Sequence, residues 1–394
     1  MATHRAFAGK GAALMARLGV QCPLVVAPML GVSTPELVAA VAGTGALAFL
    51  PHGTADAATL PHLIARTQAL LAPGAAFGVN LFVPSGCYTD RGSWTPAQRD
   101  AAVSAQARQA ARLGLGSDAP PPAPAGLGDL EANLERQVAA IIAGGVRCVS
   151  LHFGWLPDHL AARLRDAGIV VVACATNLDE ALHLVQLGAD CVVAQGREAG
   201  GHRGTFLNPD RWREDGMVGC FRLVREIVTA TDVPVIAAGG IMDGRGIAAA
   251  IEAGACAAQC GTAFLLSPEA ATHPLHRAAL QSSAADSATA SGGGGGGGGG
   301  GVAVTKVLSG KPAQGLRTEW MVSMADLDTA LPNCFNGLPL GRTVAARSAT
   351  ANDFAAMSCW AGTGHAECRA GLGAAELARL LVQEADDAMG QSTL

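Results

Sequence analysis

Eight short apolar runs recur along the first 260 residues and alternate with segments whose apolar residues have helical spacing. The runs occupy residues 24–29, 46–50, 77–82, 148–153, 169–175, 190–195, 234–238 and 255–260. Most are apolar throughout, as parallel strands covered on both faces should be. Eight strand–helix units in succession predict an α/β fold, a closed (β/α)8 TIM barrel, with a doubly wound open sheet as the alternative.

The remaining segments are expected to form an insertion, a loop and a C-terminal segment in addition to this barrel. Residues 84–129, after the third run, are expected to form an insertion that contains a helix over 96–113. A run of ten glycines, Gly292 to Gly301, should form a mobile surface loop because it has no side chains to bury. The expected organisation is therefore a barrel over 1–290, a polyglycine loop over 291–301 and a C-terminal helical segment over 302–394 that packs on the barrel.

Local patterns within this C-terminal segment predict an extended piece at 302–308 and helices near 321–331 and 374–385.

Composition excludes several classes of function. The net charge is −5 and the sequence has no cluster of basic residues, so nucleic-acid binding is not expected. No apolar run has the length of a membrane span. Eleven cysteines lie scattered through apolar runs, as small buried residues do in a reducing compartment, and a cytoplasmic protein is expected. The basic N-terminus, 1–18, is interpreted as an amphipathic helix rather than a transit peptide.

Functional residues of such a barrel lie at the carboxyl ends of its strands and in the loops that follow. These positions hold Pro28, Met29, Asn80, His152, Gln195, Gly200, Gly201, His202, Gly239, Gly240, Gln259, Gly261 and Thr262. The glycine turns after the seventh and eighth runs each lead toward a helix and predict a phosphate site. The cofactor or substrate is therefore expected to carry a phosphate.

The amides of Asn80 and Gln195 suit the polar edge of a planar heterocycle better than a metal. No metal site is expected, since the chain has neither an HExxH nor a paired CxxC motif. Cys359, His365 and Cys368 are read as buried cysteines and a surface histidine rather than as zinc ligands.

The stretch 194–204 combines a strand end, two adjacent glycines and a histidine. The glycines allow close approach of the backbone to a ligand, and imidazole is suited to proton transfer near neutral pH. His202 is therefore the candidate catalytic residue. For His152 a secondary role in the pocket and simple packing at the barrel rim are left as equal alternatives.

The motifs resemble the nitronate monooxygenases, also called 2-nitropropane dioxygenase-like proteins. The resemblance rests on Ala27-Pro28-Met29, Gly78-Val79-Asn80, the 195–204 motif, 237–241, 259–264 and Trp360-Ala361-Gly362-x-Gly364. One departure is Thr363, which stands where the family pattern has glutamine.

This resemblance implies an FMN-dependent TIM barrel that oxidises nitronates, either propionate 3-nitronate or alkyl nitronates, with O2 to a carbonyl product and nitrite. It implies that Pro28 and Met29 line the isoalloxazine and that His202 is the active-site histidine. FMN would be bound by Asn80, Gln195, Gly200, Gly201, Gly239, Gly240 and the 259–262 turn. The expected partners are a small-molecule substrate and O2, and a homodimer is the assembly considered.

Two alternatives stay open. The first is an FMN-dependent NAD(P)H reductase of the same superfamily, acting on an enoyl-thioester or a quinone. The second is a flavin-free phosphate-binding barrel that acts as an isomerase or lyase. The second has the least support, because Asn80 and Gln195 occur without a suitably placed lysine base.

Overall fold

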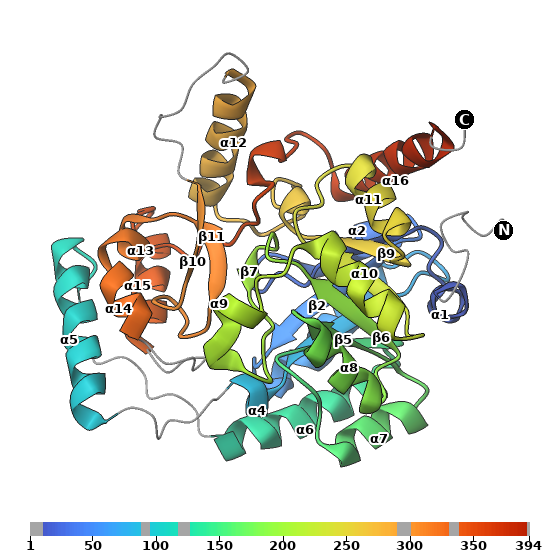
Figure 1. Cartoon of the computed structure of the whole chain (residues 1–394), viewed down its shortest axis with the longest axis horizontal. Helices are drawn as coiled ribbons and strands as arrows, with labels where there is room; N and C mark the ends of the chain where they lie inside the picture. Colours follow the sequence, from blue (N-terminus) through green and yellow to red (C-terminus); the bar gives the residue numbers. More distant parts are fainter. Residues whose placement is uncertain (1–10, 88–94, 117–126, 290–300, 331–338, 392–394) are drawn as a thin grey trace.

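The computed structural model describes residues 11–87, 95–116, 127–289, 301–330 and 339–391 (Figure 1). Eight parallel strands close into a barrel in the order β1-β2-β3-β4-β5-β6-β8-β9. This confirms the predicted (β/α)8 fold over the open sheet. The strands are β1 (Leu24–Val26), β2 (Leu47–Gly53), β3 (Gly78–Phe82), β4 (Cys148–His152), β5 (Val170–Ala175), β6 (Cys191–Gln195), β8 (Val235–Ala238) and β9 (Ala257–Cys260).

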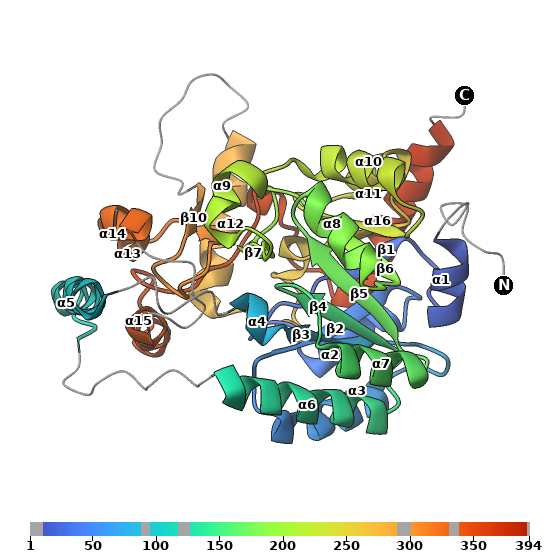
Figure 2. The same cartoon turned by 60° about the horizontal axis from the view of Figure 1, so that its bottom comes forward.

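Helices follow the strands and cover the outside of the barrel (Figure 2). They are α2 (Pro35–Ala42), α3 (Leu60–Leu70), α6 (Leu127–Ala143), α7 (Asp158–Asp166), α8 (Leu178–Gln186), α10 (Cys220–Ala230) and α11 (Gly244–Glu252). Three of them begin at side chains that accept a backbone N–H of the first turn: Thr34 at α2, Asn177 at α8 and Asp243 at α11. Such caps satisfy amides that have no partner within the helix.

The barrel interior is a separate apolar core that is closed at its amino-terminal end. Helix α1 (Ala12–Leu18) contributes Leu14, Met15 and Leu18 to the same buried cluster as Val25, Phe49 and other inward-facing strand residues. The nine cysteines that the structure resolves as free are all buried, several of them in this core. With one end filled, the opposite end of the barrel is where a ligand can enter.

The C-terminal segment adds a second, smaller sheet. Strands β10 (Val302–Thr305) and β11 (Ala313–Leu316) form an antiparallel pair, and β11 also pairs with β7 (Gly201–His202). The extended piece predicted at 302–308 therefore ends as a strand at Thr305, and the β7–β11 pairing was not foreseen. This pairing attaches the loop after β6 to the C-terminal segment.

Helices complete this segment: α12 (Pro274–Thr289), α13 (Glu319–Ser323), α14 (Ala325–Ala330), α15 (Pro339–Thr350) and α16 (Ala374–Gln391). The helix predicted near 321–331 is two short helices, because the chain leaves the helical conformation at Met324. Helix α15 was not predicted, and α16 extends beyond the predicted 374–385. Helix α16 packs against α11 and α2 of the barrel.

Helix α5 (Pro96–Arg112) of the predicted insertion lies beside the C-terminal helices (Figures 1 and 2). Its Ala102 and Ala110 share a buried cluster with Trp320, Met321 and Val344. Short helices α4 (Pro84–Cys87) and α9 (Trp212–Asp215) follow β3 and β7. Residues 88–94 and 117–126 of the insertion, and the polyglycine run up to residue 300, lie outside the described residues. None of the helices within the described ranges combines the length and the hydropathy that a membrane span requires.

The contact between α11 and α16 leaves no room for a side chain at Gly244. A Cβ atom there would collide with Cβ of Glu384 and with the backbone of Ala385. We expect Gly244→Ala to lower the free energy of unfolding by about 1–3 kcal/mol, the usual cost of overpacking. The control is Gly128→Ala, also at the start of a helix but with open space around it, and it should change stability by less than about 0.5 kcal/mol. Equal stability of the two variants in urea unfolding would contradict the described packing.

Candidate active site

A cavity of about 360 Å³ lies at the carboxyl ends of the barrel strands. Every residue predicted for the site lines it: Pro28, Met29, Asn80, His152, Gln195, Gly200, Gly201, His202, Gly239, Gly240, Gln259, Gly261 and Thr262. The volume lies within the range of about 300–1,000 Å³ that is typical of small-molecule and cofactor sites. The structure therefore brings together residues from six of the strand ends, from β1 to β9.

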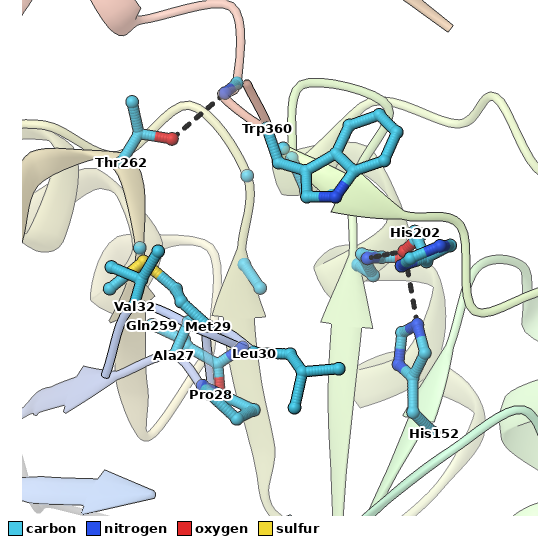
Figure 3. Close-up of a pocket in the computed structure, with 18 of the residues that line it drawn as sticks. Ala27, Pro28, Met29, Leu30, Val32, His152, His202, Gln259, Thr262 and Trp360 are labelled. Carbon is cyan, nitrogen blue, oxygen red and sulfur yellow. Dashed lines mark hydrogen bonds between the residues drawn. The ribbon is translucent and has the colours of Figure 1, made fainter. Parts of the chain in front are cut away.

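The loop after β1 forms one side of the cavity (Figure 3). Ser33 stabilises it, because its hydroxyl accepts the Met29 N–H (3.2 Å) and donates to the Ala27 carbonyl (3.3 Å). This turn presents Pro28 and Met29 to the cavity, with Leu30 half exposed beside them. The loop thus supplies an apolar wall.

The two predicted amides hold backbone as well as lining the cavity. Asn80 donates from Nδ2 to the Ser150 hydroxyl (2.9 Å), which fixes the plane of its amide. Gln195 donates from Nε2 to the His202 carbonyl (2.8 Å), and its Oε1 accepts the Gly204 N–H (2.8 Å). The Gln195 side chain therefore closes the loop between Gly196 and Gly204.

Arg203 holds the same loop in place through its buried side chain. Its side chain is 1% exposed and donates to the carbonyls of Gly196 (2.6 Å), Gln195 (2.9 Å) and Gly216 (2.8 Å). Burial lowers the pKa of the guanidinium to about 10, so it stays charged at neutral pH. Arg203 is thus a structural cation beneath the site.

The buried carboxylate of Glu180 fixes the following residues. It accepts the N–H groups of Thr176 (2.8 Å) and Phe206 (2.7 Å), and burial raises its pKa. A buried carboxyl group that accepts several hydrogen bonds resists local rearrangement, since moving it would leave the donors unpaired. The loop that carries His202 is therefore rigidly supported at its far end.

The backbone of His202 belongs to β7, and its ring faces the cavity (Figure 3). Ring atom Nε2 lies 2.9 Å from the Ser309 hydroxyl, which is also 3.2 Å from the carbonyl oxygen of Lys311. When the hydroxyl donates to that carbonyl, Nε2 carries the ring proton and donates to Ser309. The Trp360 ring lies 5.5 Å from the imidazole, between centroids. The ring orientation is thus set by residues of the C-terminal segment.

His152 lies below the His202 backbone (Figure 3). Its Nε2 is 3.1 Å from the His202 carbonyl, which can only accept, so Nε2 carries the proton. Burial, with the charges of Arg203 and Lys311, lowers the pKa of His152 to about 4 despite that hydrogen bond. His152 is therefore a neutral donor at pH 7. Of the two alternatives, this geometry favours a supporting role at the cavity wall over simple packing.

The glycine turns after β8 and β9 line the cavity. Helix α11, which follows β8, has N–H groups in its first turn that are bonded to other parts of the protein. Gly239 and Gly240 have φ of 136° and 68°, values that favour glycine. At the start of α11, the Gly244 N–H donates to Glu384 (3.0 Å) and the Gly246 N–H to Asp243 (2.8 Å). The amides of Gly244 and Gly246 are therefore already paired within the protein, and the predicted phosphate site at the two turns stays a prediction.

Two glycines allow the loop after β6 to meet the C-terminal segment. A Cβ on Gly200 would lie 2.6 Å from the Gly362 nitrogen. The Gly362 N–H donates to the Thr262 hydroxyl (3.0 Å) and the Thr363 N–H donates to the Glu198 carbonyl (3.0 Å). The Thr363 backbone therefore connects the C-terminal segment to the loop after β6.

Sequence reasoning missed several lining residues: Leu308, Ser309, Ser358 and Trp360 from the C-terminal segment, and His276 from α12. The 360–364 motif was noted without a place in the site. Nothing local marks Ser309 or His276, which reach the cavity only through the fold. His276 Nε2 is buried and has no hydrogen-bond partner among the described residues, so this wall offers a polar atom to a ligand. Within the described residues, no cluster of three or more His, Cys, Asp or Glu side chains could hold a metal.

Comparison with known proteins agrees with this geometry. The family model described as nitronate monooxygenase matches residues 12–384. A nitronate monooxygenase of Pseudomonas aeruginosa is 38% identical over 380 residues, which cover 93% of this chain and 97% of the relative. One of Paraburkholderia phytofirmans is 36% identical over 388 residues, with 96% of each chain covered.

A solved structure of nitroalkane oxidase from Streptomyces ansochromogenes is similar over 96% of this chain and 99% of its own, with a TM-score of 0.81 and 32% identity. The match in sequence and in fold extends over the barrel and over the C-terminal segment that completes the cavity. The chain is an oxidoreductase that belongs to the nitronate monooxygenase family.

Proposed function

We propose that this enzyme uses FMN and O2 to oxidise nitronates to a carbonyl product and nitrite. The observation that carries the proposal is the placement of His202: its ring faces a cavity whose other walls are the apolar 27–32 loop and the glycine turns of β8 and β9. Family membership supports the same activity. No specific observation favours the reductase or isomerase alternative.

The donor set of the cavity fits FMN. The turns at 239–240 and 261–262 offer backbone close enough for a phosphate, without a competing charged side chain among the described lining residues. Asn80 and Gln195 offer amides to a heterocycle edge, and Pro28 and Met29 an apolar face. The unpartnered His276 Nε2 is a further polar group for a bound ligand. FMN, when bound, would accept electrons from the nitronate and pass them to O2.

The residues around His202 would bind and orient the anionic substrate. With Nε2–H donating to Ser309, the imidazole would hold the nitronate oxygens through Nδ1–H when it is a cation, and neutral Nδ1 would act as base where a neutral nitroalkane enters. Ser309 holds the His202 ring at Nε2, and the Trp360 ring of the C-terminal segment lies next to the imidazole. The Gln195 and His152 donors hold its backbone carbonyl in place. These contacts would keep the imidazole oriented before substrate arrives.

The direct test is oxygen uptake by the FMN-loaded enzyme with an alkyl nitronate, with nitrite measured as product. We expect O2 consumption that depends on the nitronate, together with nitrite formation. Loaded enzyme that consumes no O2 with any nitronate would contradict the proposed function.

We expect His202→Asn to retain FMN and to lower turnover about 100-fold or more, the usual scale for loss of a group that moves or holds a proton. Flavin absorbance after gel filtration measures cofactor retention, and O2 uptake measures turnover. The matched control is His159→Asn, an exposed histidine on α7 that lies outside the cavity. Turnover of His202→Asn equal to that of the control would remove His202 from the reaction.

The low pKa of His152 leads to a prediction about how the stability of the fold depends on pH. Its folded pKa of about 4 lies below the ordinary 6.5, so the unfolded state binds more protons between these values. Stability from this group is complete above pH 6.5 and falls as pH drops toward 4, by at most about 1.4 kcal/mol per pH unit. His152→Gln should therefore show a flatter decline in urea unfolding over that window. Parallel declines in the variant and the wild type would show that His152 does not resist protonation.

A further inference from the structure

A tight turn of the C-terminal segment carries Ser309 to the cavity. Gly310 has a φ of 84°, which favours glycine, and its N–H donates to the Lys306 carbonyl (2.7 Å). On the other side of the turn, the Arg203 N–H donates to the Pro312 carbonyl (2.8 Å), next to the pairing of β7 with β11. The turn is therefore held at both ends, and Ser309, which is 5% exposed, is fixed at the cavity wall.

The hydroxyl of Ser309 lies between two backbone groups and one ring nitrogen. The Lys311 N–H (3.4 Å) can only donate to it, and the Lys311 carbonyl (3.2 Å) can only accept from it. His202 Nε2 (2.9 Å) can do either. If the hydroxyl donates to the carbonyl and Nε2 carries the ring proton, every one of these contacts is a hydrogen bond. If the hydroxyl donates to Nε2 instead, two oxygen atoms face each other at 3.2 Å with no hydrogen between them, so the first arrangement is favoured.

Aromatic rings keep the imidazole of His202 in this orientation. The ring centroids of Trp360, Phe153 and Phe82 lie 5.5, 6.0 and 6.1 Å from the imidazole centroid. A half turn of the imidazole would take Nε2 away from Ser309, and the packed rings around it resist that motion. The nitrogen held by the protein is thus Nε2, and Nδ1 is the nitrogen that can exchange a proton with a ligand.

We propose that Ser309 is a positioning residue for proton transfer at His202. Its hydroxyl keeps the ring proton on Nε2, so that the lone pair is on Nδ1. This role rests on the proposed function. In the proton step, Nδ1 takes a proton from the α-carbon of a neutral nitroalkane, and the C–H electron pair forms the C=N bond of the nitronate. The imidazolium keeps its Nε2–H bonded to Ser309. An imidazole with its proton on Nδ1 could donate to nitronate oxygens but could not take that proton.

The position of the ring proton can be measured without turnover. Long-range nitrogen–proton correlation NMR of the isotope-labelled protein distinguishes the two neutral tautomers, and the His202 signals are identified by their loss in His202→Asn. We expect Nε2–H in the wild type and a shift of the proton to Nδ1 in Ser309→Ala, where the acceptor hydroxyl of Nε2–H is removed. A wild-type proton on Nδ1, or the same tautomer in both proteins, would overturn the proposed role of Ser309.

A matched pair of substrates tests the role in the reaction. Nitroethane must lose a proton before it is oxidised, whereas its anion, ethyl nitronate, has already lost it. We expect Ser309→Ala to lower kcat/KM for nitroethane by about tenfold or more and for ethyl nitronate by less than about threefold, measured by O2 uptake of the FMN-loaded enzyme. Ser309→Thr, which keeps the hydroxyl, should restore the ratio. The matched control is Ser323→Ala, which removes a hydroxyl of α13 outside the cavity and should change neither value.

The pair of substrates also separates this role from the proposed function. Equal losses for the two substrates would mean that Ser309→Ala displaces the ring rather than its proton, which would refute the role. Wild-type enzyme that oxidises ethyl nitronate but not nitroethane would show that His202 does not take this proton, and would refute the role while the proposed function stands. No oxidation of ethyl nitronate by the wild type would contradict the proposed function, and the NMR result would still decide where the ring proton lies.

Discussion

The loop between Gly196 and Gly204 is held by the barrel on one side and by the C-terminal segment on the other, and the active cavity depends on both attachments. On the barrel side, Gln195 and Arg203 bind its backbone carbonyls. On the other side, β11 pairs with its Gly201 and His202. The carbonyl of His202 is therefore fixed to the barrel while its ring is fixed to Ser309. Loss of either attachment would change where the imidazole lies.

The buried charges around this loop explain why it can hold one geometry. Arg203 and Glu180 are both almost fully buried, and each makes several hydrogen bonds to backbone groups of the loop or its continuation. Displacing either would leave charged or polar groups unpaired in a low dielectric, which is costly. These two residues support the loop, whereas the described residues that line the cavity include no Lys, Arg, Asp or Glu. The residues that support the loop are thus different from those that line the cavity.

The sequence predicts the barrel well because each strand is a local apolar run between turn signals. It also brings the predicted site residues together correctly, since the carboxyl ends of parallel strands meet at one end of a barrel. The attachment of the loop could not be predicted. His202 and Ser309 are 107 residues apart, and a two-residue strand such as β7 has no local pattern. Likewise, nothing near Gly244 indicates that Glu384 will occupy the start of α11.

A firmly held imidazole, two glycine turns and an apolar loop line one cavity. In the proposed function a nitronate, rather than a nicotinamide, delivers electrons to FMN in this cavity. The most direct measurement is the visible spectrum of the FMN-loaded protein after anaerobic mixing with an alkyl nitronate and, separately, with NADH or NADPH. We expect the nitronate to bleach the flavin absorbance and the nicotinamides to leave it unchanged. Rapid bleaching by NADH or NADPH with no response to the nitronate would contradict the proposed function.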